Sequence, residues 1–333
     1  MRKVHLLAIA GAAMSISLSC HAATLIPVIA PSGAVTTRLL GINDSNIIAG
    51  SYFDSSNVEH GFFGTLDGNY TTFDFGGSST GTEIRGIGDD GSVDGFAATP
   101  GFVFGQEFFR APDGTVSTFT HKGTTLDGVV QGITKSEISF GDYFNGNGKR
   151  TGFEGRKGHF KAKFDFPLAN LQNSPRGTNR AGVVAGYFID SGGGEHGFTL
   201  QNGVANVIDY PNADAQLTVL EGINNGGVAT GQWNDSNGNP HAFVLDTTTG
   251  TFTDLTADDG SSFQQAWGIN NHGLVAFSTS AASYIYCPRS PSHCPGTGTA
   301  ISLHTTHVVP GAFLKYARKS PPEGHLAKGA AAQ

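Results

Sequence analysis

Charged side chains are scarce in this chain. Asp, Glu, Lys and Arg make up 14% of its 333 residues, against about 25% in an average soluble protein. Met and Trp occur only twice each, whereas Gly occurs 48 times and Phe 24 times. Residues that favour helices are few and turn-forming residues are abundant. This composition argues against a mainly helical protein and favours an all-β fold with many turns.

Long apolar segments are also lacking, apart from one near the N-terminus. That stretch runs from Val4 to about Leu18, after the basic residues Arg2 and Lys3. It is shorter than the roughly 18 or more uninterrupted apolar residues of a membrane-spanning helix. Small residues follow it, suited to cleavage after Ala22. We therefore predict a signal peptide over residues 1–22, no transmembrane span, and export, either to the periplasm or out of the cell.

Cysteine is rare, with three in the chain. Cys20 lies in the predicted signal peptide. A lipid anchor on Cys20 is an alternative, although Ser17 stands where lipoprotein signals usually have Leu. The other two, Cys287 and Cys294, lie in the segment "CPRSPSHC". In an oxidising compartment this pair predicts a disulfide. A metal site that also uses His293 is the alternative.

The chain has an excess of acidic charge. Its formal net charge is −7, and it becomes −9 without residues 1–22. Residues 304–333 carry a net +3, which leaves −12 on residues 23–303. A body this acidic repels phosphate backbones, so we expect no nucleic-acid partner. Residues 304–333 contain prolines and mixed charges, and we expect them to form a disordered tail.

A repeat of 45 or 46 residues organises the rest of the sequence. Its anchor is a Gly that usually precedes Ile and Asn, at Gly41, Gly86, Gly132, Gly177, Gly222 and Gly268. A second Gly follows nine residues later in the first five copies, and the sixth copy has Phe277 there. A Phe follows 21 residues after the anchor at Phe62, Phe153, Phe198 and Phe243, and one place later at Phe108. Such constant spacing indicates one structural unit used six times.

Each copy predicts four short strands separated by turns, as in residues 39–43, 47–53, 60–65 and 70–75 of the first copy. Four strands in about 45 residues are typical of one blade of a β-propeller. We therefore predict a six-bladed propeller over residues 23–303. A β-solenoid and a pair of β-sandwiches are the alternatives. Either residues 24–31 or residues 299–304 supply the fourth strand of the last blade, and the sequence leaves both open.

Three histidines occupy one position of the repeat, two residues before the Phe that recurs 21 residues after the anchor glycine. They are His60, His196 and His241, and each follows a turn that contains Asp54, Asp190 or Asp235 respectively. A catalytic group is needed once, whereas these recur around the ring. We therefore interpret them as hydrogen-bonding groups that join a turn to a strand within each blade.

Linear motifs of common enzymes are missing: there is no Gly-x-Ser-x-Gly, no His-Glu-x-x-His and no phosphate-binding Gly-x-x-x-x-Gly-Lys-Ser/Thr. We predict no catalytic or cofactor-binding residue. Asp235, Asn237 and Asn239 have the spacing that begins a calcium loop, but Pro240 stands where an EF-hand has Gly. Calcium at such a turn is therefore an alternative only.

Two further sets of residues have a structural and a functional interpretation. Arg85, Asp89, Asp90 and Asp94 lie close together in the second copy and are either turn residues or residues of a central channel. Trp233 and Trp267 could stack on sugars, but other copies have core residues at their positions. We expect both tryptophans to pack in the core.

Several segments resemble the bacterial extracellular HAF repeats, named for a His-Ala-Phe that stands here at residues 241–243. They are "GINDSNIIAGSYFDSSNVEHGFFGTLDG", "GVVAGYFIDSGGGEHGFTL" and "GINNGGVATGQWNDSNGNPHAFVLD". The resemblance covers about residues 39–290. It implies an exported repeat protein and implies no activity, ligand or catalytic residue.

Two functions are consistent with the sequence. The first is an exported, non-enzymatic binding or scaffold module, whose partner is an extracellular polysaccharide, cell-wall material or an envelope protein. Loops on a rigid frame are common recognition sites. The alternative is a polysaccharide lyase or glycoside hydrolase, with carboxylates from several blades meeting at the channel.

Overall fold

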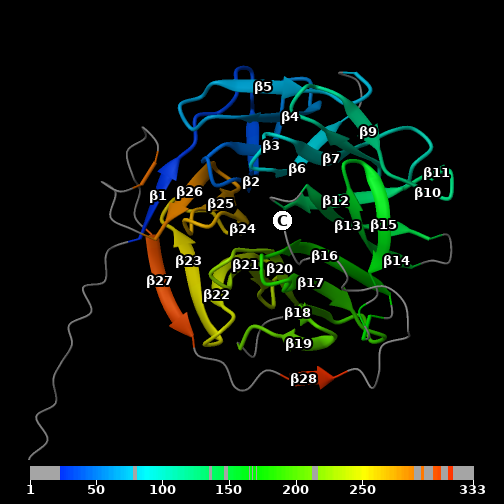
Figure 1. Ribbon diagram of the computed structural model, residues 1–333. Coiled ribbons are helices and arrows are strands. Elements are labelled where there is room, and N and C mark those ends of the chain that lie inside the picture. The colour runs from blue at the N-terminus through cyan, green and yellow to red at the C-terminus, as the bar shows by residue number, and fades with distance from the viewer. Residues whose placement is uncertain are drawn as a thin grey trace, which may run out of the picture.

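The computed structural model describes residues 23–77, 81–134, 137–145, 149–164, 166, 168–169, 171–211, 217–288, 294–295, 303–308 and 314–317. The protein is a six-bladed β-propeller, as the repeat predicted. Its blades are arranged around a central axis, with one strand of each blade lining the centre (Figure 1). Residues 1–22, the predicted signal peptide, lie outside the described residues.

The blades follow the sequence repeat. Blade 1 consists of β2 (Thr36–Ile42), β3 (Ile48–Phe53), β4 (Glu59–Gly64) and β5 (Tyr70–Phe73). Blade 2 consists of β6 (Thr82–Ile87), β7 (Val93–Ala97), β8 (Gln106–Arg110) and β9 (Val116–Thr118). Blade 3 consists of β12 (Gly128–Ile133), β13 (Ile138–Phe144), β14 (Arg150–Arg156) and β15 (His159–Phe164). Blade 4 consists of β16 (Gln172–Thr178), β17 (Val184–Ile189), β18 (Glu195–Gln201) and β19 (Val204–Ile208). Blade 5 consists of β20 (Leu217–Ile223), β21 (Val228–Asn234), β22 (Pro240–Asp246) and β23 (Thr251–Ala257). Blade 6 consists of β24 (Gln264–Ile269), β25 (Val275–Thr279), β26 (Ser283–Cys287) and β1 (Thr24–Pro27). A short hairpin of β10 (Thr120–His121) and β11 (Thr124–Thr125) precedes blade 3.

The N-terminal strand closes the ring. β1 pairs antiparallel with β26, from Thr24↔Cys287 to Pro27↔Tyr284, and so completes blade 6. The alternative, a fourth strand from residues 299–304, is wrong. From Leu303 the chain instead forms β27 (Leu303–Val308), which pairs with β23 of blade 5. A closing strand from the opposite end of the chain ties the first and last blades together without a separate link.

The recurring Phe forms the centre of each blade and also joins neighbouring blades. Its side chain is fully buried at Phe62, Phe108, Phe153, Phe198 and Phe243. The apolar residue that ends one repeat packs on the Phe of the next blade, as in Phe73–Phe108, where the ring centroids are 5.3 Å apart. Because no blade buries both faces alone, this packing couples the stability of each blade to that of its neighbours.

A β-bulge recurs in every inner strand, just before the anchor glycine. In blade 1 it brings the carbonyl oxygen of Arg38 so close to Gly50 that a Cβ on Gly50 would lie 2.0 Å from it. This explains the second glycine of the first five repeats. In the sixth copy the irregularity extends from Ala266 to Ile269, which accommodates Phe277 at that position.

The tail differs from the disorder that we expected over residues 304–333. Two of its segments form strands: β27, and β28 (Leu314–Ala317), which pairs with β19. Residues 309–313 and 318–333 lie outside the described part of the chain. No helix long and apolar enough to cross a membrane occurs among the described residues.

Candidate functional site

The six anchor glycines lie where neighbouring inner strands come closest. A Cβ on Gly86 would be 2.8 Å from the Cα of Gly132, and one on Gly268 would be 3.1 Å from the Cα of Gly41. A larger residue at either of these two positions would push the inner strands apart. The anchors therefore set the width of the central channel.

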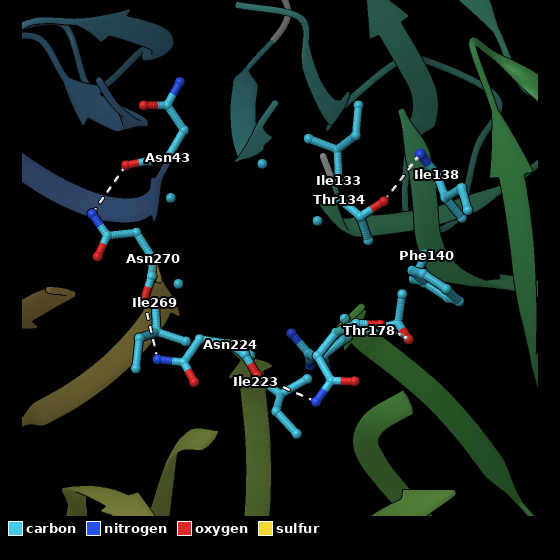
Figure 2. A pocket seen from close by; sticks show the side chains of 18 of the residues that line it. Asn43, Ile133, Thr134, Ile138, Phe140, Thr178, Ile223, Asn224, Ile269 and Asn270 are labelled. Carbon is cyan, nitrogen blue, oxygen red and sulfur yellow. Dashed lines mark hydrogen bonds between the residues drawn. The ribbon is translucent and has the colours of Figure 1, made fainter. Parts of the chain in front are cut away.

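The Asn of the anchor motif joins each blade to the next. In blade 1, Oδ1 of Asn43 accepts hydrogen bonds from the backbone N–H groups of Ser45 and Ile47, at 3.0 and 2.9 Å. Its Nδ2 donates to the carbonyl oxygen of Gly88 in blade 2, at 2.9 Å. The same bond to the next blade recurs for Asn179, Asn224 and Asn270, with donor–acceptor distances of 3.3, 3.2 and 3.0 Å. One amide thus closes its own turn and fixes the neighbouring blade (Figure 2).

The residue after this Asn forms a second set of bonds between blades. The backbone N–H of Asp44 donates to Oδ1 of Asp89, and that of Asn271 donates to Oδ1 of Asp44, at 3.0 and 2.8 Å. Arg180 and Asn225 donate in the same way to Asn225 and Asn271, at 2.7 and 2.8 Å. The channel mouth is therefore a rigid rim of amides and carboxylates.

This rim encloses a cavity of about 1400 Å³ on the propeller axis. Its wall contains the residue after each anchor glycine: Ile42, Ile87, Ile133, Thr178, Ile223 and Ile269. One layer deeper, the residue before each anchor glycine lines it: Leu40, Arg85, Gln131, Arg176, Glu221 and Trp267. A side extension reaches Ile138 and Phe140 of blade 3 (Figure 2). The cavity thus combines an apolar wall with a polar inner layer.

The inner layer is internally paired. Arg176 forms an ion pair with Glu221, with Nη1 and Oε2 2.8 Å apart, and the same nitrogen donates to Oε1 of Gln131 at 2.5 Å. The guanidinium of Arg85 lies over the ring of Trp267, 5.1 Å from its centroid, and its Nε pairs with Glu83. The side chains are thereby fixed in place before a ligand arrives, which reduces the entropy cost of binding.

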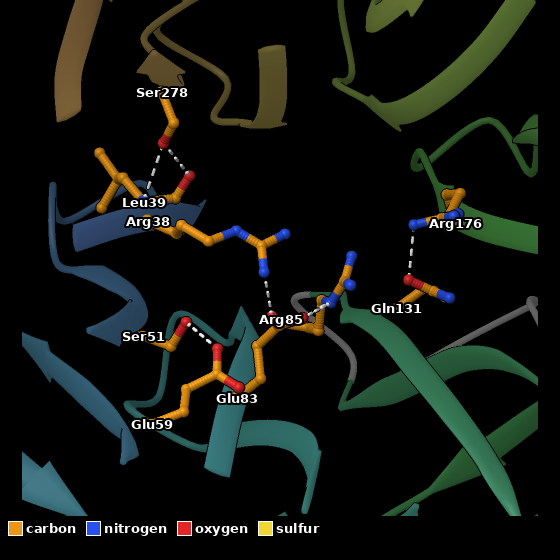
Figure 3. A network of polar contacts seen from close by, with 9 residues as sticks. All are labelled: Arg38, Leu39, Ser51, Glu59, Glu83, Arg85, Gln131, Arg176 and Ser278. Carbon is orange, nitrogen blue, oxygen red and sulfur yellow. Dashed lines mark hydrogen bonds and ion pairs between the residues drawn. The ribbon is translucent and has the colours of Figure 1, made fainter. Parts of the chain in front are cut away.

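Beyond this layer the network continues through Glu83 to Arg38 and Glu59 (Figure 3). Nη1 of Arg38 lies 2.6 Å from Oε2 of Glu83. Burial and the nearby Glu83 raise the pKa of Glu59 to about 7. Burial also acts on Glu83, but Arg85 and Arg38 outweigh it and hold the pKa of Glu83 below its usual value. Glu59 is thus the more easily protonated of the two carboxyl groups.

This carboxyl pair does not line the cavity. Glu83 is also only 3% exposed. We assign no catalytic role to this pair.

Two further carboxyl groups are buried between blades 2 and 3. Asp94 and Glu107 are both fully buried. Burial raises the pKa of Asp94 to about 7. Burial, together with the nearby charge of Asp142, raises the pKa of Glu107. Because both groups are more easily protonated in the folded state, they make stability depend on pH.

The repeated histidines lie at the outer part of the blades, away from the cavity lining. Nδ1 of His60 is 2.9 Å from Oδ1 of Asp74, and its Nε2 is 3.5 Å from Oδ2 of Asp54. His196 contacts Asp209 and Asp190 in the same way, at 2.7 and 3.6 Å. Nε2 of His241 is 3.4 Å from Oδ2 of Asp235. Each ring also stacks on an aromatic residue of the preceding strand, namely Tyr52, Phe188 and Trp233 respectively.

The sequence interpretation did not identify the second partner of these histidines. Asp74 and Asp209 lie just after the fourth strand, and Asp254 occupies the corresponding part of blade 5. An Asp near that position in three repeats was the available signal. Acidic residues are common in turns, so this recurrence alone does not single out a histidine partner.

The predicted disulfide is present. Cys287 and Cys294 are bonded, with their Cα atoms 5.9 Å apart. Cys287 ends β26, where its register partner is Thr24 of the closing strand. The disulfide therefore fixes the segment that follows the last blade beside the point where the ring closes. His293 lies outside the described residues.

No group of three or more His, Cys, Asp or Glu is placed to hold a metal ion in the part of the chain that the structure describes. In the turn with calcium-like spacing, Oδ1 of Asp235 accepts backbone hydrogen bonds from Asn237 and Asn239, both at 2.9 Å. Of the residues with two interpretations, Arg85, Asp89 and Trp267 line the cavity. Trp267 is also buried and packs in a core cluster with Leu39 and Leu274, as expected. Asp94 is buried, and Trp233 packs in the core of blade 5.

No protein-family model matches the chain, and no curated protein matches it. Among solved structures, it is similar to the catalytically inactive virginiamycin B lyase from Staphylococcus aureus with quinupristin, at 12% identity and a TM-score of 0.47 over 79% of this chain and 98% of that one. A streptogramin B lyase structure matches at 14% identity and a TM-score of 0.44, over 79% of this chain and 96% of that one. A chain of a mitotic checkpoint complex matches at 10% identity and a TM-score of 0.40, over 86% of this chain and 98% of that one. At this level of similarity the matches carry no argument about the activity or ligand of this chain.

Proposed function

We propose that this chain is an exported, non-enzymatic binding module that holds a glycan, from an extracellular polysaccharide or from cell-wall material, in its central cavity. The observation that supports this most is the cavity of about 1400 Å³ with its pre-arranged polar layer. Cavities of several hundred Å³ with a few fixed polar groups are the usual form of a ligand site. The apolar N-terminal segment and the resemblance to HAF repeats support export.

The charges of the lining favour a neutral, hydroxyl-rich ligand. Its basic residues are Arg85, Arg156, Arg176 and Arg180, and its acidic residues are Asp44, Asp89, Glu154 and Glu221. These charges balance, so the lining does not select for a strongly anionic ligand. The rim contains both donors and acceptors, and Trp267, with Arg85 and Arg38 over its ring, borders the cavity. Sugar hydroxyls can both donate and accept hydrogen bonds, which suits such a lining.

The test is a thermal melt of the disulfide-bonded protein against a panel of polysaccharides and cell-wall fragments. A ligand at 100 times its Kd should add about 2.7 kcal/mol of stability. Trp267→Phe should weaken binding of the selected glycan, whereas Trp233→Phe, in the core of blade 5, should not. A panel with no selective shift would contradict glycan binding and would favour an envelope protein as the partner.

The same panel tests the enzymatic alternative. Depolymerisation of a selected polysaccharide, lost in Glu221→Gln, would identify an enzyme. Binding without depolymerisation supports the proposed binding module.

A further inference from the structure

After the closing blade, the chain returns to the outside of the ring and adds a strand to each of two neighbouring blades. β27 pairs antiparallel with β23, from Phe252↔Val308 to Ala257↔Leu303. β28 pairs antiparallel with β19, from Val204↔Ala317 to Val207↔Leu314. Figure 1 shows both strands on the outer rim, beside blades 5 and 4. We call β27 and β28 together the C-terminal arm.

The two covered edges differ from the other outer edges. β23 has seven residues with Asp254 as its one charge, and β19 has five residues with none. The carboxylate of Asp254 accepts a hydrogen bond from the hydroxyl of Tyr210 at 2.6 Å, so it is already engaged within the blade. Outer strands with little charge and no proline expose unpaired N–H and C=O groups that readily pair with another strand.

The uncovered edges have features that discourage pairing. β5 and β9 have only four and three residues. β1 ends in Pro27, and β15 presents the exposed Lys161 and Lys163. Short length, proline and lysine are the usual protections of an edge strand. Among the described residues, none of these four edges has an added strand. The arm thus covers the two edges that lack such protection.

We propose that the outer edges of β23 and β19 are strand-acceptor sites for an extended peptide, and that the C-terminal arm occupies them, either in its own chain or by exchange in a second copy. Backbone hydrogen bonds supply most of the affinity when a strand is added to a sheet edge. Nothing in such a ladder requires that donor and acceptor belong to the same chain.

Charge favours the same pairing. Residues 304–333 carry a net +3, whereas residues 23–303 carry −12. Opposite charges attract this C-terminal segment of either copy to the propeller, although Lys315 is the one charged residue of the arm itself with His neutral. Within one chain the linkage gives the arm a high effective concentration, on the order of millimolar. Exchange is therefore expected when protein concentration is high or when the resident arm is displaced.

The test uses the full chain with the arm disabled in place. The donor-deficient variant carries Thr305→Pro, Thr306→Pro, Lys315→Pro and Tyr316→Pro. In an antiparallel pair, every second residue points its N–H group toward the partner strand. Of two adjacent prolines, one therefore always removes an N–H group that would bond to β23 or β19. The matched control carries Ala at the same four positions, which keeps every N–H. The probe is a synthetic peptide of residues 301–319.

Hydrogen exchange of β23 and β19 and binding of the labelled peptide are the two readouts. We expect the proline variant to lose protection in both strands, to bind the peptide about tenfold or more tightly than the alanine control does, and to regain protection on binding. We also expect it to form a complex with the native chain, visible by light scattering. Equal peptide binding by the two variants, or unchanged protection of β23 and β19 in the proline variant, would overturn the proposal.

Discussion

Nδ2 of Asn270 donates a hydrogen bond of 3.0 Å to the carbonyl oxygen of Asn43, across 227 residues of sequence. The same atom pair joins Asn179 to Asn224, where the residues are 45 apart. Ring closure therefore repeats the contact that joins consecutive blades. The last inner strand meets the first as it would meet a next blade, and no special closing device is needed in the inner layer.

Asn270→Asp should destabilise the closed ring. Oδ1 of Asn270 accepts hydrogen bonds from the backbone of His272 and Leu274, and Asp keeps these acceptors. It loses the donor to Asn43 and places a negative oxygen against a carbonyl. We expect a loss of about 1–3 kcal/mol in the free energy of unfolding, measured by urea denaturation. The same substitution at Asn179 is the control for an internal junction; a native-like stability of both variants would contradict this role.

Reducing the Cys287–Cys294 disulfide should lower the melting temperature. The bond closes a short loop of sequence separation 7 beside the closing strand. For a loop of this size the entropic contribution is about 2–3 kcal/mol. Melting with and without reductant measures it. The double variant Cys287→Ser, Cys294→Ser should melt like the reduced protein and be insensitive to reductant, and an effect of reductant on this variant would refute the assignment.

Asp94→Asn should stabilise the protein above neutral pH. Burial raises the pKa of Asp94 to about 7, above its unfolded value of about 4. The contribution of Asp94 is therefore fully present below about pH 4 and is lost as pH rises through about 7. Asn stays neutral, so we expect a gain of up to about 4 kcal/mol at pH 8 and little change at pH 4. Urea denaturation at the two pH values measures the difference.

Asp235→Asn is the control, because its effect on stability should depend on pH in the opposite direction to that of Asp94→Asn. Backbone hydrogen bonding from Asn239 holds the pKa of Asp235 below its usual value. The stabilising contribution of Asp235 is present at neutral pH and is lost in acid. We expect Asp235→Asn to weaken the fold at pH 8 and to have less effect at low pH. If both variants responded to pH in the same direction, the account of the buried carboxyl would be wrong.

His60→Gln should remove a contribution that exists only at lower pH. Burial would lower the pKa of His60, but Asp74 and Asp54 outweigh it and raise this pKa. The charged His60 therefore stabilises blade 1 below pH 6.5, its ordinary value, and the effect fades as pH rises through the raised pKa. We expect the variant to melt lower than the native chain at pH 5.5 and closer to it at pH 9. A pH-independent difference would indicate that ring stacking on Tyr52 alone matters.

The fold could be predicted because the repeat appears directly in the sequence. Gly41 and its equivalents recur for a steric reason, as do Phe62 and its equivalents, so their spacing reveals the blade. The site could not be located in the same way. Arg85, Gln131, Arg176, Glu221 and Trp267 share one repeat position but differ in type, and only the closed ring brings them together.

The tail shows a different limit. Residues 304–333 have the composition of a disordered segment. The prediction of disorder rests on this local composition alone. β27 is held by the backbone of β23, whose free edge depends on the position of blade 5 in the ring. Strand addition uses backbone groups that every residue has, and composition gives little sign of it.

The most direct test of the central claim, a glycan held in the channel cavity, uses the fluorescence of Trp267. The chain has two tryptophans. Trp267 lines the cavity, whereas Trp233 is stacked between Tyr210 and His241 in blade 5. In Trp233→Phe, Trp267 is the one remaining tryptophan, and the glycan panel can be titrated against its emission. We predict a saturable change with at least one glycan, together with a higher melting temperature. A glycan that raises the melting temperature without changing the emission of Trp267, or a panel with no response at all, would contradict the account.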